Sequence, residues 1–291
     1  LGNGADYGAK IAVNEAATRV YVAGNVELLS DGSKIIFSES PWEVELKVED
    51  AVADTDYCGF IACYEAKDGK LVWARAAVAT VLYMNDVAVE TVDGKDFVYV
   101  CGFLLGEEAL FYGQFSTFKL KGKGFTDLFV AKYDGEGWVK WARSGGGSKD
   151  DQAFSLALDD HVVYITGFFN GLNNDAYIAR RENDATEFQA LTEDPDNGVD
   201  ILLAMFSKYD GEFLGARVAG GYGDDFGYGV TVDCCDKPNK KVYVTGSFVG
   251  TATFGKEEHG ESAARAETLV SEGNSQEDIF VAAWMVKGML M

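Results

Sequence analysis

Hydrophobic and polar positions alternate along the chain in short runs, and one pattern of runs occurs four times. The clearest run is a strand-length segment of β-branched and aromatic residues that ends in glycine. Its copies are Val20–Gly24, Val98–Gly102, Val163–Gly167 and Val242–Gly246. This composition and a period of two predict β-strands. The small residue and the glycine that end each copy predict a close approach of a neighbouring backbone.

Three further strands accompany each of the first three copies, and two accompany the fourth. One is predicted before it, at Gly8–Val13, Asp86–Val89, Phe154–Leu158 and Gly227–Val232. Another is predicted after a connection of variable length, at Gly59–Tyr64, Leu128–Tyr133, Ile201–Tyr209 and Ile279–Trp284. The last follows a tight turn, at Lys70–Ala76, Trp138–Ser144 and Glu212–Ala219. The turns contain Asp68-Gly69, Asp134-Gly135 and Asp210-Gly211, in which glycine is expected to supply a positive φ. The segment Lys256–Val270 is expected to be loop.

Four short antiparallel strands per unit, repeated in tandem, predict an all-β protein of the β-propeller class. We expect one domain over residues 1–291, with blades at 1–79, 80–147, 148–221 and 222–291. Adjacent blades would cover one another, because a single small sheet cannot bury both of its faces. The chain is expected to form either a small propeller or part of a larger one.

The chain also resembles a known repeat family. The segment Gly223–Asp233 leads to Val242–Gly246 and then to Ser247–Gly255, and Asp127–Asp134 is followed by Trp141-Ala142-Arg143. Together these motifs closely resemble the β-propeller repeat family called SBBP, over nearly the whole chain. The resemblance implies a propeller of extracellular or cell-surface proteins that serves as a non-catalytic module. It implies no active-site residues.

The charge of the chain narrows the range of partners. Asp and Glu number 47 against 25 Lys and Arg, which gives a formal net charge of −22. Such a surface argues against binding to nucleic acid and against docking to anionic lipid. The longest apolar runs, such as Ile201–Phe206, have the length of a strand, so we expect no membrane insertion.

The cysteines and histidines offer little chemistry. The five cysteines are Cys58, Cys63, Cys101, Cys234 and Cys235, without a C-x-x-C pattern. A Cys58–Cys63 bridge and two buried thiols both remain open. His161 and His259 are the only histidines and are interpreted as exposed turn or loop residues. We therefore expect no enzyme based on histidine.

One acidic segment is a candidate calcium site. Asp194, Asp196 and Asp200 alternate around a glycine turn, as oxygen ligands of a hard cation do. The full Asp-x-Asp-x-Asp-Gly pattern is missing, and Asp200 recurs as Asp56, Asp127 and Asp278. That recurrence favours a turn hydrogen bond for Asp200. Calcium is the one candidate cofactor.

Several other residues recur at the blade ends. They are Arg75, Arg143 and Arg217, then Asp6, Asp151 and Asp225, and also Trp73 and Trp141. Repetition in each blade favours structural roles over several active sites in one chain. The arginines and aspartates predict an ion pair or a bond to the backbone, and the tryptophans predict packing between blades.

The function predicted from these features is a non-catalytic scaffold that binds other proteins through its blade-connecting loops. Those loops are Glu27–Thr55, Leu104–Thr126, Asn170–Val199 and Val249–Glu277. A carbohydrate-binding propeller is the alternative, with glycans as partners, although Tyr112, Tyr177 and Phe254 stand in unlike settings. A quinone-type oxidoreductase is the weaker alternative, suggested only by the segment Ala66–Trp73.

Overall fold

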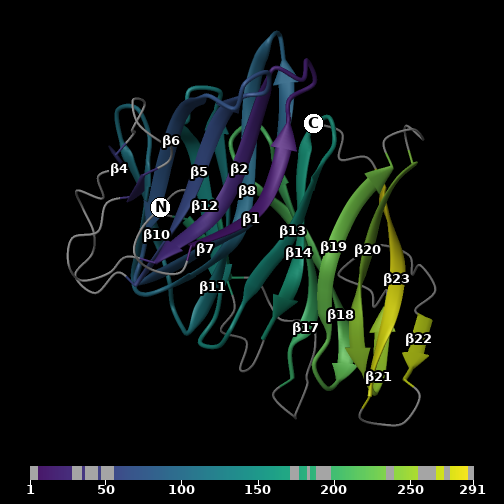
Figure 1. Ribbon diagram of the computed structural model, residues 1–291. Helices are drawn as coiled ribbons and strands as arrows, with labels where there is room; N and C mark the ends of the chain where they lie inside the picture. Colours follow the sequence, from purple (N-terminus) through teal and green to yellow (C-terminus); the bar gives the residue numbers. More distant parts are fainter. Residues whose placement is uncertain are drawn as a thin grey trace. The chain divides into compact units, whose positions relative to one another are not determined.

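Short alternating segments joined by tight turns favour antiparallel strands over helices, and the described part of the chain contains strands and no helix. The computed structural model describes residues 6–27, 35–36, 45–46, 56–170, 177–181, 184–187, 198–233, 239–254, 267–271 and 276–287 (Figure 1). It divides into two compact units, Leu1–Ser144 and Gly145–Met291.

The strands follow one order in every repeat. Repeat 1 comprises β1 (Asp6–Val13), β2 (Arg19–Glu27), β5 (Tyr57–Glu65) and β6 (Leu71–Val78). Repeat 2 comprises β7 (Val81–Val92), β8 (Lys95–Leu105), β11 (Thr126–Asp134) and β12 (Val139–Gly146). Repeat 3 comprises β13 (Gln152–Leu158), β14 (Val162–Phe169), β17 (Asp200–Ser207) and β18 (Phe213–Tyr222). Repeat 4 contains β19 (Phe226–Asp233), β20 (Asn239–Val249) and β23 (Glu277–Lys287).

Within each repeat, neighbouring strands pair in sequence order. The pairing is antiparallel from the first strand to the second and from the second to the third. The fourth strand then pairs with the third in repeats 1, 2 and 3. Every predicted strand overlaps one of these, and the largest difference is in β7, which begins at Val81 and not at Asp86. In the first unit the sheet is curled.

The glycines that end the second strands lie where no side chain fits. A Cβ on Gly24, Gly102, Gly167 or Gly246 would collide with the carbonyl oxygen of Tyr7, Tyr83, Gln152 or Phe226, respectively. Each of these carbonyls lies just before a bulge in the first strand. A bulge bends its strand locally, and here the carbonyl before it occupies the space that a Cβ would need, so only glycine is accommodated. The predicted close approach is confirmed in all four repeats.

The tight turns match the prediction in two places. Gly69 and Gly211 have φ values of 70° and 71°. In the turn after β11 the left-handed residue is Gly137, with φ of 84°, and not the predicted Gly135. In all three turns the left-handed glycine directly precedes the residue whose carbonyl closes the turn, and here that residue is Trp138, which accepts the Asp134 N–H.

The connections between second and third strands contain hairpins that were not predicted. They are β3–β4 (Ile35–Ile36, Glu45–Leu46), β9–β10 (Glu108–Tyr112, Thr117–Lys121), β15–β16 (Tyr177–Arg181, Asp184–Glu187) and β21–β22 (Thr251–Phe254, Glu267–Val270). Three of them extend the sheet of the preceding repeat: β9 pairs with β6, β15 with the end of β12, and β21 with β18. In the segment predicted as loop, Glu267–Val270 is therefore a strand.

The core of each unit lies between two repeats. In the first unit, Tyr21 and Ile61 of repeat 1 share a buried cluster with Val87 and Val98 of repeat 2. In the second unit, Tyr164 and Ile201 of repeat 3 share one with Val242, Val244 and Phe280 of repeat 4. The largest buried cluster of each unit is therefore shared by two neighbouring repeats.

Candidate interaction surfaces

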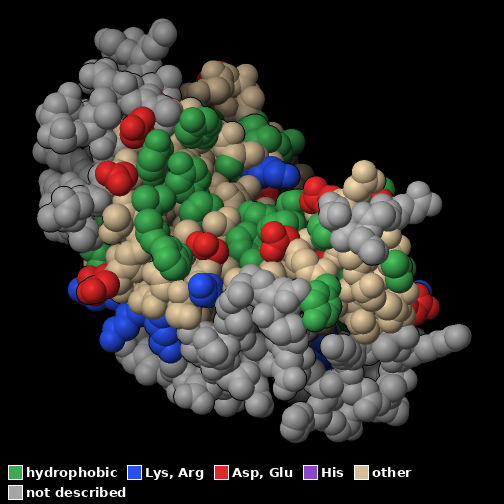
Figure 2. Space-filling model, turned by 90° about the horizontal axis from the view of Figure 1, so that it is seen from below, with side chains coloured by type: hydrophobic (Ala, Val, Ile, Leu, Met, Phe, Trp, Pro, Cys, Tyr) green, Lys and Arg blue, Asp and Glu red, His purple; other side chains and the backbone are tan. Residues whose placement is uncertain are grey.

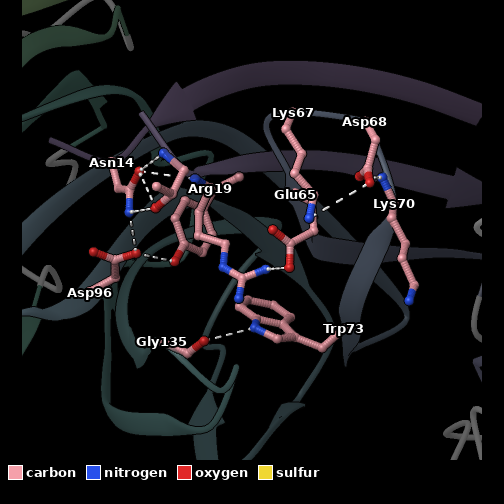
Figure 3. A network of polar contacts seen from close by, with 11 residues as sticks. Asn14, Arg19, Glu65, Lys67, Asp68, Lys70, Trp73, Asp96 and Gly135 are labelled. Carbon is pink, nitrogen blue, oxygen red and sulfur yellow. Dashed lines mark hydrogen bonds and ion pairs between the residues drawn. The ribbon is translucent and has the colours of Figure 1, made fainter. Parts of the chain in front are cut away.

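A polar network joins repeats 1 and 2 at the edge of their shared core (Figure 3). Asn14 directly follows β1, and its Oδ1 accepts the backbone N–H groups of Thr18 and Arg19 at 2.8 and 3.0 Å. Its Nδ2 donates across the junction to Oδ2 of Asp96, at 2.9 Å. The same oxygen of Asp96 accepts the Tyr21 hydroxyl at 2.6 Å, and the Thr91 hydroxyl donates to Oδ1 of Asp96 at 2.7 Å. Asp96 of repeat 2 therefore fixes two side chains of repeat 1.

The second unit has a corresponding network between repeats 3 and 4. Asp159 directly follows β13, and its Oδ1 accepts the N–H groups of His161 and Val162, each at 2.7 Å. Its Oδ2 accepts the Tyr164 hydroxyl at 2.9 Å and the Nζ of Lys240 at 2.7 Å. Lys240 belongs to repeat 4, so this ion pair crosses the junction.

Burial and hydrogen bonding act in opposite directions on Asp159. Burial alone would raise the pKa of this carboxyl, because it penalises the charged form. The donors outweigh burial: Lys240 first, then the two backbone N–H groups, then the Tyr164 hydroxyl. The pKa of Asp159 therefore lies below its ordinary value. In the first unit, burial and the bond to Asp96 raise the pKa of Tyr21, which keeps its hydroxyl protonated.

Trp73 packs between repeats, as predicted from its position. Its side chain is buried, and its indole N–H donates to the Gly135 carbonyl of repeat 2 at 2.8 Å. The ring also lies against Gly137 in the same turn. The ring centroids of Trp141 and Tyr99 lie 6.2 Å apart within repeat 2. The ring centroids of Trp73 and Tyr21 lie 6.0 Å apart within repeat 1.

The recurring arginines bond to the backbone, as one of the two predicted alternatives states. Arg75, Arg143 and Arg217 each donate Nη1 to the carbonyl of the residue before them, at 2.7 to 3.0 Å. Arg75 also donates to the Glu136 carbonyl and lies over the ring of Trp138. A guanidinium with several fixed donors suits this position, because it can bond to backbone carbonyls of two repeats.

The recurring aspartates join strand ends. Asp151 and Asp225 are fully buried. Asp151 accepts the N–H groups of Gly147 and Asn170, and Asp225 accepts those of Gly221 and Val249. In both cases the carboxylate ties the end of the preceding repeat's fourth strand to the end of its own repeat's second strand. Asp6 occupies the matching position at the start of β1.

The candidate calcium site falls largely outside the described residues, because Asp194 and Asp196 are not among them. Asp200 is described; it is buried at the start of β17, with its carboxylate against Gly220. Of its counterparts, Asp127 accepts the Lys123 N–H at 2.8 Å, a turn bond of the predicted kind. Within the described residues no group of three His, Cys, Asp or Glu side chains could hold a metal ion. Calcium binding stays a prediction.

The cysteines and one histidine can be placed. Cys58, Cys63 and Cys101 are free and buried, so the Cys58–Cys63 bridge is not formed. Burial raises the pKa of Cys58 to about 12 and that of Cys63 to about 11, which leaves both as unreactive thiols. His161 is exposed, as predicted. Cys234, Cys235 and His259 lie outside the described residues.

Exposed aromatic side chains occur in the connection between β8 and β11. Phe115, in the turn between β9 and β10, is 92% exposed, and Phe125, just before β11, is 61% exposed. The hairpin that carries Phe115 is held by pairing of β9 with β6. Figure 2 shows one face of the molecule on which hydrophobic side chains reach the surface with single charged side chains between them. Phe115 lies in the turn of this hairpin and Phe125 beyond its other end, so they are two separate candidate contact residues of this connection.

A second group of aromatic rings lies at the bulges of β13 and β19. Phe226 and Tyr228 stack with centroids 5.8 Å apart, Phe154 stacks on Tyr228 at 5.7 Å, and Phe168 contacts Phe154 and Phe226. Half of Tyr228 is exposed. This group was not predicted, because two of its members, Phe154 and Tyr228, occupy bulge positions that hold Ala9 and Asn85 in repeats 1 and 2. Of the aromatic residues considered for glycan binding, Tyr177 and Phe254 are buried and Tyr112 is half-buried.

The chain matches no protein-family model and no curated protein. The resemblance to the SBBP repeat therefore stays a prediction. No helix among the described residues is long and apolar enough to cross a membrane.

Proposed function

We propose that the chain is a β-propeller scaffold without catalytic activity, which binds other proteins through its connecting segments. In this proposal each repeat is a blade, and residues 1–291 form one domain. The polar residues that recur in the repeats support it, because they are used to join one repeat to the next. Bonds between adjacent repeats are made by Asp151, Asp225, Arg75 and Trp73.

The observation that carries the proposal is the exposure of Phe115 and Phe125 on a connection fixed by strand pairing. Large aromatic side chains give most of the binding energy when they enter a protein interface, and a rigid support lowers the entropy lost on binding. Connections on a rigid scaffold are also where binding residues concentrate. The extracellular or cell-surface location that we propose rests on the repeat resemblance alone.

The test is binding of proteins from a native extract to the immobilised chain, followed by cross-linking and identification of the cross-linked residues. Phe115→Ser with Phe125→Ser should weaken capture of the partner at least about tenfold, since buried aromatic contacts are worth about 2 kcal/mol each. Tyr209→Ser is the matched control, because Tyr209 is equally exposed in a turn of the second unit. Unchanged capture by the double variant would contradict the proposal.

Carbohydrate binding is the second candidate, and the stacked rings around Tyr228 favour it. A half-exposed aromatic face can stack on the apolar face of a sugar ring, as aromatic side chains in binding sites do. A glycan array probed with the chain and with Tyr228→Ala separates the two functions. Glycan binding that depends on Tyr228, together with protein capture that does not depend on Phe115, would replace the scaffold proposal.

A further inference from the structure

Three aromatic rings form a row across the junction between repeats 1 and 2, within the first unit. Tyr57 begins β5, and Tyr83 and Phe103 face one another in the paired strands β7 and β8. The ring centroids of Tyr57 and Tyr83 lie 5.4 Å apart with their planes at 39°, and Tyr83 stacks on Phe103 at 5.0 Å. All three side chains are half-buried. The aromatic row therefore keeps part of its surface open to a ligand.

Backbone hydrogen bonds fix the aromatic row where the two repeats meet. The Asp56 N–H donates to the Thr80 carbonyl at 2.8 Å, next to the point where β5 and β7 come together. The Met84 N–H donates to Oδ1 of Asn25 at 2.7 Å. Asn25 is buried in β2, so this bond ties β7 to the repeat before it. A rigid support of this kind lowers the entropy lost when a ligand binds.

A carboxylate and a fourth aromatic side chain border the row on the side of repeat 1. Glu27 ends β2 and pairs with Tyr57, so their side chains share one face of the sheet. Tyr7 of β1 pairs with Asn25, which lies two residues before Glu27 and therefore on the same face. Tyr7 is 54% exposed. An open aromatic face and a carboxylate thus lie on the face that carries Tyr57.

The charge at this place favours a cation as the ligand. Burial raises the pKa of the Tyr57 and Tyr83 hydroxyls, and the nearby Glu27 carboxylate acts in the same direction on both. The two hydroxyls also hydrogen-bond to each other, and they stay protonated. Asp56, directly before Tyr57, is exposed. A cation gains energy from these carboxylates and from the electron-rich ring faces, whereas a neutral sugar gains nothing from the charge.

Two other aromatic groups of the first unit already hold a cation of the chain itself. Arg75 lies 4.2 Å from the ring centroid of Trp138. Lys132 lies 4.3 Å from the ring centroid of Phe97 and 5.1 Å from that of Tyr99. Among the residues that the structure describes, no lysine or arginine lies over the aromatic row. A cation on the row would therefore come from another molecule.

We propose that the aromatic row, together with Tyr7 and Glu27, binds an arginine side chain of a partner protein. A guanidinium is planar and weakly hydrated, so it stacks on aromatic rings more readily than an ammonium and can donate to a carboxylate at its edge. The net charge of −22 attracts a basic partner from a distance. This site rests on the proposed function, because its ligand belongs to a partner protein, and it adds the charge of that partner.

Small amides test the site in the full chain. The Nα-acetylated amides of arginine, lysine and citrulline are titrated while the tyrosine ring signals are followed by NMR. The arginine amide should bind saturably, and the citrulline amide, which has nearly the same shape without the charge, should bind at least about tenfold more weakly. Equal binding of the arginine and lysine amides would mean general attraction to an acidic surface and would overturn the inference. Tighter binding of tetramethylammonium or of a methyl glycoside would overturn it as well.

Matched variants locate the binding. Glu27→Gln removes the carboxylate and should weaken binding of the arginine amide about three- to tenfold. Glu15→Gln removes the same charge at an exposed turn of repeat 1 and should leave binding unchanged. Tyr7→Leu removes the most open ring and should weaken binding about threefold, whereas Tyr209→Leu, at an exposed turn of the second unit, should have no effect. Equal effects of the site variants and their controls overturn the inference.

The site and the proposed function can fail separately. Phe115→Ser with Phe125→Ser should leave binding of the arginine amide unchanged, because neither residue belongs to the aromatic row. The arginine amide, and not the citrulline amide, should release captured partner proteins from the immobilised chain. Capture that depends on Phe115 and Phe125 but resists the arginine amide would overturn this site and keep the scaffold function. Capture that the arginine amide releases and the double variant retains would support this site and contradict the proposed contact residues.

Discussion

The junction between repeats 1 and 2 and the junction between repeats 3 and 4 have the same geometry. The carboxylate belongs to the following repeat in the first junction and to the preceding repeat in the second. After the first strand, Asn14 and Asp159 each accept two backbone N–H groups through Oδ1. In the following repeat, Asp96 and Lys240 occupy the same position, three residues before the tyrosine of their own second strand. Asp96 bonds to Asn14, and Lys240 bonds to Asp159. An amide donates to a carboxylate in the first unit, and an ammonium donates to a carboxylate in the second.

In both junctions the tyrosine of the preceding repeat donates its hydroxyl to the carboxylate, whichever repeat carries that carboxylate. Tyr21 donates across the junction to Asp96, whereas Tyr164 donates to Asp159 in its own repeat. The position after the first strand therefore needs only two properties: an oxygen for the turn, and a second atom complementary to the next repeat. Which side carries the charge is free to change, provided that both sides change together.

The largest expected effect comes from breaking this complementarity in the second unit. Lys240→Asp places a second carboxylate against Asp159, whose side chain is 1% exposed. An uncompensated buried charge should lower the free energy of unfolding of this unit by about 3–5 kcal/mol. Hydrogen exchange of the β13, β14, β19 and β20 amides measures the loss locally.

Lys241→Asp makes the same change of charge at the adjacent exposed position. It should cost less than about 1 kcal/mol, because exposed charges are well solvated. Equal losses in the two variants would show that net charge, and not the junction, is responsible.

A compensating substitution should recover most of that loss. Asp159→Asn combined with Lys240→Asp reproduces Asn14 and Asp96 in the second unit. The amide introduced at position 159 can still accept the N–H groups of His161 and Val162, and Tyr164 can donate to the carboxylate introduced at position 240. We expect the double variant to lie within about 1–2 kcal/mol of the original, compared by a double-mutant cycle. Additive losses would mean that the two junctions are not equivalent.

The four repeats could be predicted from the sequence, because their signals are local. Gly24, Gly102, Gly167 and Gly246 are fixed by a carbonyl that leaves no space for a Cβ, so the residue type repeats with the structure. The strands of the additional hairpins, such as β21 with four residues, are too short for alternation to be recognised. Their pairing with a preceding repeat adds stability that no local pattern reveals.

The junction networks could not be predicted, for a different reason. Asn14 and Asp159 share a position, as do Asp96 and Lys240, but the residue types differ and in one case the charge is reversed. The two residues of a junction must complement each other, but each residue type can change if its partner changes too. For this reason neither position shows the same residue in every repeat. By contrast, Arg75, Arg143 and Arg217 bond to backbone carbonyls, which are the same in every repeat, and these residues could be recognised.

Acid should affect the second junction through Asp159. The folded-state pKa of this carboxyl is lowered from 3.8, so its interactions stabilise the folded unit fully above the pKa of the unfolded chain. That stability is lost as the pH falls below about 3.8 and through the lowered pKa. Hydrogen exchange of β13 and β14 between pH 5 and pH 2, about the range where carboxyls titrate, should show the loss in the original chain. Asp159→Asn should remove this part of the pH dependence, and an unchanged profile would assign the acid sensitivity to other carboxyls.

The smallest effect concerns a contact that only the first unit has. Trp73 donates to the Gly135 carbonyl, whereas the equivalent residue of repeat 3, two before its arginine, is Gly215. Trp73→Phe keeps most of the ring packing and removes the N–H, so the first unit should lose about 1 kcal/mol. Exchange of the amides in the turn between β11 and β12 measures this, with Val72→Ala on the exposed face of β6 as the control. No loss would mean that ring packing alone holds the turn. The difference between Trp73 and Gly215 would then be one of side-chain volume only.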